Sequence, residues 1–200
     1  MSVDQTDPKQ YQLQLDNKIT AFQKTMAEAS VDIRVPTVYK SAPLGFRMRA
    51  EFRIWHEQGQ VYYGMNRPGE KRPYIIEDFP IGSPLINQLM PPLLAALNAS
   101  PVLSRKCFSA EFLTSTSGEA LITLIYHRPL DAEWEAEARA LQARLKVGII
   151  GRSRKQKLIL DRDYITERLQ VGDREYIYQQ VESGFTQPNA QINTHMLNWA

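Results

Sequence analysis

Apolar and charged residues alternate without interruption from Phe46 to Ile54. This period of two predicts a β-strand that directs Arg47, Arg49 and Arg53, together with Glu51, towards one face of a sheet. Planar guanidinium groups match the geometry of phosphate oxygens, so the pattern favours the start of a nucleic-acid surface. The alternative is a solvated sheet face on which Glu51 tethers two of the arginines.

Helical periodicity appears in three other parts of the chain. After Pro8, apolar side chains recur at helical spacing and predict an amphipathic helix that packs on the rest and ends at Val35-Pro36. Ser83-Pro84 forms a start signal for a second helix, which Pro91 and Pro92 are expected to kink or split. Asp131 is the predicted N-cap of a third helix. The stripes of these helices are Tyr11, Leu15, Ile19, Phe22 and Met26; Leu85, Ile86, Leu89, Leu93, Leu94 and Leu97; and Trp134, Ala138, Leu141 and Leu145.

Strand patterns joined by tight turns fill much of the remainder. Residues 47–56 and 61–65 flank a turn with Gly59, and residues 107–115 and 119–127 flank a turn with Gly118, so two hairpins are predicted. Residues 74–77, 147–151, 157–160 and 175–180 are predicted as further short strands. Hairpins mixed with intervening helices indicate an α+β fold, with a mixed or antiparallel sheet and flanking helices.

Composition changes this picture little, whereas the distribution of charge changes it more. A chain of 200 residues with a formal net charge of +2 is large enough for one domain or two small ones, and its net charge alone does not identify a nucleic-acid binder. A basic run without an acidic residue nevertheless contains Arg144, Lys146, Arg152, Arg154, Lys155 and Lys157. With Arg105-Lys106 and the arginines of the alternating strand, it forms three basic segments that the fold could bring onto one surface.

Two aromatic residues near these cations are candidates for stacking against unpaired bases. Phe108 follows Lys106, and His127 ends an otherwise apolar strand. Exposed aromatic rings beside cations are the usual means by which proteins recognise RNA loops. The alternative for Phe108 is core packing, and the alternative for His127 is a polar residue at the end of a strand.

Other chemistries find little support. One cysteine, Cys107, excludes a disulfide framework, and three dispersed histidines lack metal-ligand spacing, so no metal is predicted. Cys107 is interpreted as a small hydrophobic residue rather than a nucleophile. No glycine-rich nucleotide loop is present. The absence of a signal peptide or a long apolar run predicts a cytoplasmic protein without a membrane segment.

Several segments of the chain resemble the bacterial tRNA (uracil-5-)-methyltransferase family. They are residues 46–56, 85–90, 124–127, 150–152 and 179–189, the last of which is QQVESGFTQPN. Phe46 stands where the family has tyrosine. The resemblance implies a cofactor, S-adenosylmethionine, with Gln187 contacting it and Phe185 lining the same site. It also implies that Arg53, Phe108 and His127 meet the T-arm of tRNA, with Phe108 stacking in the remodelled loop. With the basic residues Arg47, Arg49 and Arg152, these form the predicted RNA-binding set.

The resemblance also shows what is missing from these residues. The family continues into a Rossmann-like domain with a glycine-rich loop, a nucleophilic cysteine in a Ser-Cys-Asn-Pro setting and a glutamate base, so no catalytic residue is assigned here. In the family, the cysteine adds to uracil C6 before C5 accepts the methyl group. We expect residues 1–180 to form an RNA-engaging domain and residues 181–200 to begin the cofactor-binding domain, with the remainder truncated. The predicted function is that of the N-terminal, substrate-binding part of a monomeric tRNA (uracil(54)-C(5))-methyltransferase, inactive alone. The alternative is a stand-alone T-arm binding or chaperone module.

Overall fold

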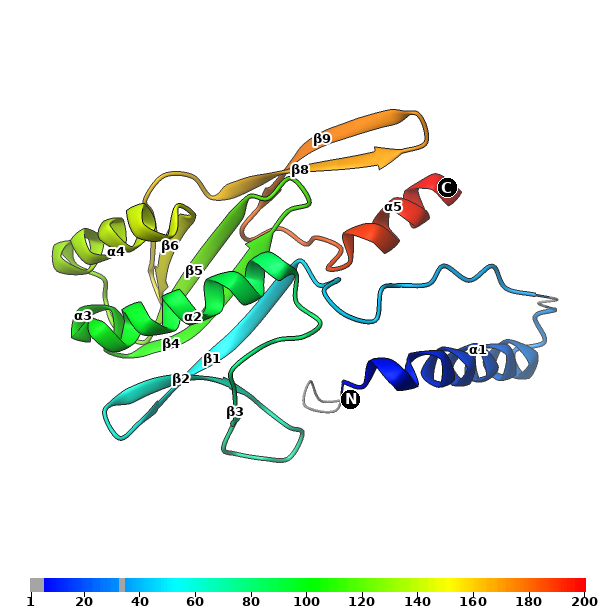
Figure 1. Ribbon diagram of the computed structural model, residues 1–200, viewed down its shortest axis with the longest axis horizontal. Helices are drawn as coiled ribbons and strands as arrows, with labels where there is room; N and C mark the ends of the chain where they lie inside the picture. Colours follow the sequence, from blue (N-terminus) through cyan, green and yellow to red (C-terminus); the bar gives the residue numbers. More distant parts are fainter. Residues whose placement is uncertain (1–5, 33–34) are drawn as a thin grey trace.

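A mixed seven-stranded sheet forms the centre of the computed structural model, which describes residues 6–32 and 35–200 (Figure 1). The strand order is β3-β2-β1-β4-β5-β6-β7, and only β5 and β6 pair in parallel. The strands are β1 (Arg49–Glu57), β2 (Gln60–Met65), β3 (Tyr74–Ile76), β4 (Cys107–Thr114), β5 (Ala120–Tyr126), β6 (Gly148–Ser153) and β7 (Gln156–Ile159). The predicted α+β class and both predicted hairpins are confirmed.

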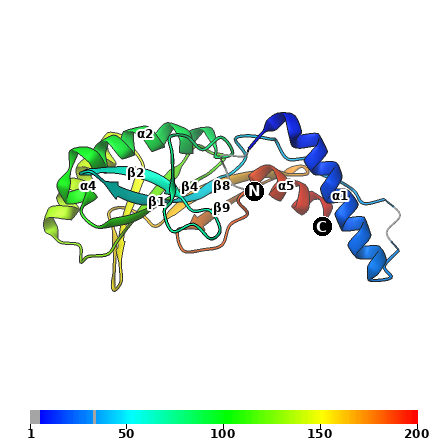
Figure 2. The same cartoon turned by 90° about the horizontal axis from the view of Figure 1, so that it is seen from below.

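Helices cover one face of this sheet and enclose the main core (Figure 2). They are α2 (Pro84–Ala99), α3 (Pro101–Ser104) and α4 (Ala132–Leu145). The predicted caps are present, because Ser83 Oγ accepts a hydrogen bond from Ile86 N and an oxygen of Asp131 accepts one from Trp134 N. Beneath α2, Phe52 makes edge-on contacts with Tyr63, Phe79 and Phe112. Burial of these apolar faces is the main stabilising contribution to the fold.

The opposite face of the sheet carries charged side chains as well as apolar ones. In β1 the even-numbered residues Ala50, Phe52 and Ile54 are buried in the core, so Arg49 and Arg53 lie on the other face. Residues paired on adjacent strands lie on the same side of a sheet. Across the sheet, successive pairing links Arg53, Ser109, Ile125, Arg152 and Lys157, so all five lie on this second face. We call this surface the open face.

A two-stranded ribbon, β8 (Tyr164–Val171) with β9 (Arg174–Val181), packs on one end of the open face and is followed by α5 (Ala190–Trp199). Ile165 of β8 joins a small second core with Leu113, Leu121 and Ile150. The strand β8 was not predicted from the sequence. Its alternation is interrupted by Glu167, whose buried carboxylate accepts hydrogen bonds from Thr116 N at 2.9 Å and Gln180 Nε2 at 2.9 Å.

Two predictions about helices are wrong in part. The first helix, α1 (Tyr11–Glu28), follows a short 3-10 turn, Pro8–Gln10, and ends before the predicted boundary at Val35-Pro36. Ser30 adopts a φ of 58°, which a continuing right-handed helix excludes. The helix buries no residue completely, and Phe22 of its stripe is 41% exposed.

Pro91 and Pro92 do not split α2, which is continuous from Pro84 to Ala99. Each proline removes one backbone donor from the helix interior. Leu93 and Leu97, in the next turns, are fully buried in the core, and this packing offsets the lost hydrogen bonds.

Within the described ranges, 6–32 and 35–200, the helices are all too short or too polar to cross a lipid bilayer.

Candidate nucleic-acid interface

Four side chains gather at one end of the open face, and we call them the aromatic–arginine cluster: Arg53, Trp55, Phe108 and His127. The rings of Phe108 and His127 are stacked, with centroids 4.3 Å apart and an interplanar angle of 22°. The guanidinium carbon of Arg53 lies 5.4 Å from the centroid of Phe108 and 5.4 Å from that of Trp55. These distances are in the range of cation–π contacts, so one charged group joins two aromatic surfaces.

A β-bulge places Phe108 in this cluster. The register of β4 against β5 shifts between Cys107, which pairs with Tyr126, and Ser109, which pairs with Ile125. The extra residue of a bulge leaves the regular ladder and its side chain is redirected. Phe108 is that residue, and its ring therefore meets His127 just beyond the end of β5, where His127 N donates to Lys106 O at 3.0 Å.

The cluster lines a depression of about 430 Å³. Trp55, which is not among the residues predicted from the sequence to bind RNA, forms part of its wall, and the indole N–H of Trp55 is buried with no hydrogen-bond partner in the described part of the chain. The sequence could have indicated Trp55, because it follows Arg53 by two residues in an alternating strand and such residues share a face of the sheet. The depression thus combines aromatic surfaces with a guanidinium group.

Cys107 borders the same depression, but its thiol points into the core. The residue is 1% exposed, and burial raises the pKa of the Cys107 thiol from 9.0 to about 12, opposed by a hydrogen bond with Tyr126 and by the charge of Arg128. A thiol with so high a pKa is protonated at neutral pH and is a poor nucleophile. This agrees with the interpretation of Cys107 as a small hydrophobic residue.

Cys107 should therefore resist alkylation in the folded protein. Raising the thiol pKa from 9.0 to about 12 lowers the thiolate fraction at pH 8 by on the order of a thousandfold, and burial adds a steric barrier. Iodoacetamide labelling followed by mass spectrometry, in buffer and in denaturant, measures the difference. Comparable labelling rates in the two conditions would contradict the buried placement of the thiol.

The other arginines predicted to bind RNA have partners within the chain. Arg49 donates from Nη1 to Gly184 O at 2.7 Å and from Nη2 to Glu182 O at 2.8 Å, and it contacts a carboxylate oxygen of Glu111 at 3.3 Å. Arg47 Nε donates to Arg49 O at 3.0 Å. Arg152 Nη1 lies 3.1 Å from Glu182 Oε1. Their RNA contacts stay predictions, and only Arg53 of the three strand arginines belongs to the cluster.

Carboxylates occupy the middle of the open face. Glu51 and Glu111 are directly opposite each other in the β1–β4 register. Burial, followed by the neighbouring charge of Glu51, raises the pKa of Glu111, while Arg49 opposes this shift. Arg49 pairs with Glu111, and Glu51 forms no ion pair with an arginine of the described residues, so the alternative in which Glu51 tethers two arginines is not observed. The strand alternation is as predicted, but it does not produce a row of free guanidinium groups.

Residues 182–189, which we call the connecting segment, are fixed to the sheet near both ends. Arg49 holds the carbonyls of Glu182 and Gly184, and Met48 N donates to Pro188 O at 2.7 Å. Between these anchors Phe185 is 86% exposed and Gln187 is also exposed. The two residues that the resemblance assigns to the cofactor thus project from a backbone held at defined points.

The fold and the cluster define a class of protein, an α+β domain with a cation–aromatic site on an open sheet face. Residues 10–200 match the sequence model of the tRNA (uracil-5-)-methyltransferase family. The chain belongs to this family.

Its relatives include two tRNA/tmRNA (uracil-C(5))-methyltransferases. The protein from Chromohalobacter salexigens is 51% identical over 208 residues, which cover 100% of this chain and 54% of the relative. The protein from Cellvibrio japonicus is 53% identical over 95% of this chain and 51% of the relative. The chain therefore spans about half the length of the curated relatives that it matches.

A solved structure shares the fold. The crystal structure of a Pyrococcus abyssi tRNA (uracil-54, C5)-methyltransferase in complex with S-adenosyl-L-homocysteine superimposes with a TM-score of 0.64. The two chains are 12% identical, and the match covers 93% of this chain and 46% of the other.

Proposed function

We propose that these 200 residues are the RNA-engaging part of an S-adenosylmethionine-dependent tRNA (uracil-5-)-methyltransferase that acts on the T-loop uridine. The observation that carries the proposal is the stack of Phe108 on His127 with Arg53 beside it, on the sheet face opposite α2 and α4 (Figure 2). The cytoplasm is the proposed compartment and a monomer the proposed state.

The cluster would receive an RNA loop whose bases have been unstacked. Phe108 and Trp55 offer aromatic surfaces to a base, and Arg53 offers a planar cation to a phosphate oxygen or to a second base. The enzyme family modifies a base that lies inside a folded loop, and extruding such a base costs a few kcal/mol. Stacking on Phe108 and His127 would offset part of that cost by stabilising the opened loop.

The connecting segment would form one wall of the cofactor site. The exposed ring of Phe185 can stack on the adenine of S-adenosylmethionine, and the side-chain amide of Gln187 can both donate to it and accept from it. S-adenosylmethionine supplies the methyl group when bound. The contribution of this chain is to hold Phe185 and Gln187 in fixed relation to the RNA-facing sheet, through Arg49 and Met48. On this basis we place the start of the cofactor-binding domain at residue 181, after an RNA-engaging domain of residues 1–180.

Residues 1–200 by themselves would bind RNA without transferring a methyl group. Attack on uracil C6 requires a thiolate, and the one cysteine of the sequence, Cys107, is buried with a pKa raised to about 12. The same observation favours a second candidate for this chain, a T-arm binding module that acts without catalysis. Methyl transfer to tRNA by the purified 200-residue chain would refute both the expected inactivity of this chain and the second candidate.

Binding of a T-arm hairpin RNA tests the proposed function directly. Phe108→Ala is expected to weaken binding by roughly 5- to 150-fold, because losing one base-stacking contact costs about 1–3 kcal/mol. Fluorescence anisotropy with a labelled hairpin at two salt concentrations measures this change.

The matched control is Phe22→Ala, which removes the same side chain from a partly exposed site on α1. Its affinity should equal that of the unaltered chain. Equal affinities for the Phe108 variant and the unaltered chain would remove the cluster from the RNA site.

A further inference from the structure

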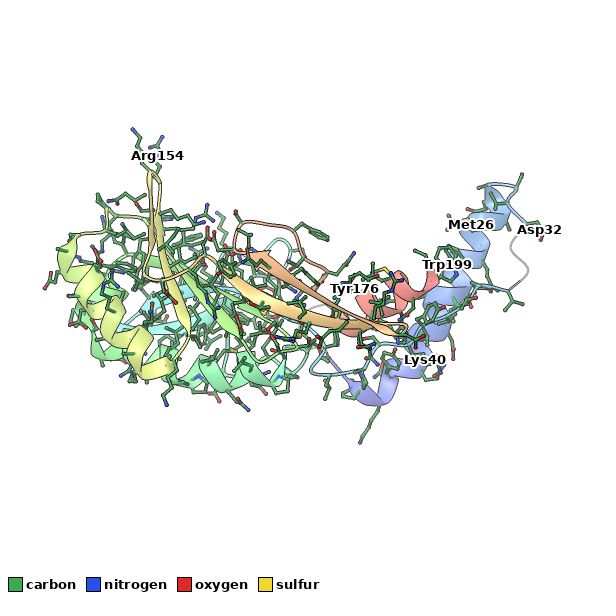
Figure 3. All side chains as sticks on the ribbon, turned by 90° about the horizontal axis from the view of Figure 1, so that it is seen from above. Met26, Asp32, Lys40, Arg154, Tyr176 and Trp199 are labelled. Carbon is green, nitrogen blue, oxygen red and sulfur yellow. The ribbon has the colours of Figure 1, made fainter. Side chains whose placement is uncertain are left out.

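The hairpin formed by β6 and β7 projects from the body of the molecule. We call residues 152–157 the basic finger. Arg154 lies at its far end, on the side of the molecule opposite α2 (Figures 2 and 3). The finger therefore rises on the side of the open face, where the aromatic–arginine cluster lies.

The charge of the finger is compensated at its base but not at its tip. Arg152 and Lys157 pair with Glu182 at 3.1 and 3.2 Å, and Lys157 also pairs with Asp163 at 2.9 Å. At the tip, Arg154 and Lys155 are exposed and form no ion pair with any described residue. Two uncompensated cations at the end of a hairpin attract an anion.

The base of the finger is rigid. Gln156 Oε1 accepts from Leu130 N at 2.8 Å, and Gln156 Nε2 donates to Leu130 O at 3.1 Å. Gly151 lies directly against Trp134, since a Cβ at this position would be 2.2 Å from a ring carbon of that tryptophan. The tip is thus presented from a fixed platform, which lowers the entropy lost on binding.

The pairing of β5 with β6 and the contact of Gln156 with Leu130 place the basic finger near the aromatic–arginine cluster. The parallel register pairs Ile125 of β5 with Arg152 of β6, and His127 and Arg154 each follow two residues later. Leu130, which holds Gln156, is three residues beyond His127. The basic tip and the Phe108–His127 stack therefore belong to the same end of the sheet.

We propose that the basic finger is a second RNA-contacting element, with Arg154 and Lys155 binding phosphates of the strand whose base occupies the aromatic–arginine cluster. The inference rests on the proposed function. The tip sequence, Ser153 to Gln156, contains no apolar side chain, so it lacks the hydrophobic anchor that a protein partner would need. Phosphate contacts of this kind carry no sequence information, so the finger would add affinity and register but not specificity.

The test is the double variant Arg154→Gln/Lys155→Gln, titrated with the T-arm hairpin over a range of salt concentrations. The loss of two phosphate contacts is expected to reduce the slope of log K against log salt by roughly 1.5. Affinity should fall on the order of tenfold near 0.1 M salt and change little near 1 M. A hairpin of different loop sequence should lose the same factor.

The matched control is Lys18→Gln/Lys24→Gln on α1, which removes two exposed positive charges far along the chain from the finger. It should leave the salt slope unchanged, and an equal loss in both variants would show a net-charge effect and overturn the proposal. If the finger variant binds fully while Phe108→Ala binds weakly, the proposed RNA contact of the basic finger is wrong and the proposed function stands. No binding by the unaltered chain would overturn the proposed function as well.

Discussion

Trp134→Ala is expected to lower the free energy of unfolding by about 3–5 kcal/mol, the range for truncating a large aromatic residue in a core. Trp134 is 0% exposed and meets the ring of Tyr126 edge-on, with centroids 5.7 Å apart and an interplanar angle of 79°. Its ring also packs directly on Gly151, where a Cβ on residue 151 would lie 2.2 Å from a ring carbon of Trp134. Removing it would leave a cavity between α4, β5 and β6, so the strand that carries the finger would lose its support.

Urea denaturation followed by circular dichroism measures the change, and Trp199→Ala is the matched control. Trp199 is 74% exposed, so its truncation should change stability by less than about 0.5 kcal/mol. Similar losses in the two variants would mean that Trp134 does not support the core as described.

Periodicity was sufficient to predict most of the secondary structure. The hairpin around Gly59 was predictable because Gln58 and Gly59 both adopt positive φ, which a tight two-residue turn requires and glycine favours. The strand β8 was not predictable from apolar alternation, because Glu167 occupies one of its buried positions. Its carboxylate is satisfied by donors that the sequence places far away, Thr116 among them.

The candidate site could be predicted only in part, for a similar reason. The resemblance pointed to Arg53, Phe108 and His127, and the structure brings these three together. The β-bulge that redirects Phe108 leaves no mark in the hydrophobic pattern. Two of the partners of Arg49 are backbone carbonyls 133 and 135 residues away, and backbone acceptors carry no sequence signal. The alternating pattern therefore predicted RNA binding for Arg47, Arg49 and Arg53 alike, although Arg49 binds backbone carbonyls and Arg53 lies beside aromatic rings.

The double variant Arg152→Ala/Lys157→Ala is expected to lower the free energy of unfolding by about 3–5 kcal/mol, because it leaves a buried carboxylate without its cations. The side chain of Glu182 is 3% exposed, and among the described residues its carboxylate would keep a hydrogen bond from Thr123 Oγ1 at 3.4 Å. Glu182 also begins the connecting segment. The lost stability should therefore appear as faster hydrogen exchange across residues 183–189, the segment proposed to carry the cofactor contacts.

The removal of Glu182 in the same background provides the decisive comparison. Arg152→Ala/Lys157→Ala/Glu182→Leu should recover at least about 2 kcal/mol of the loss, because a buried ion pair can be replaced by apolar groups at little cost. Arg168→Ala, which breaks an exposed pair with Glu175, should cost less than about 1 kcal/mol. If the triple variant is no more stable than the double, the cations do not act through Glu182. If it is stable but binds the T-arm hairpin weakly, Arg152 or Lys157 contacts RNA in addition to holding the connecting segment, and this result would support the predicted RNA contact of Arg152.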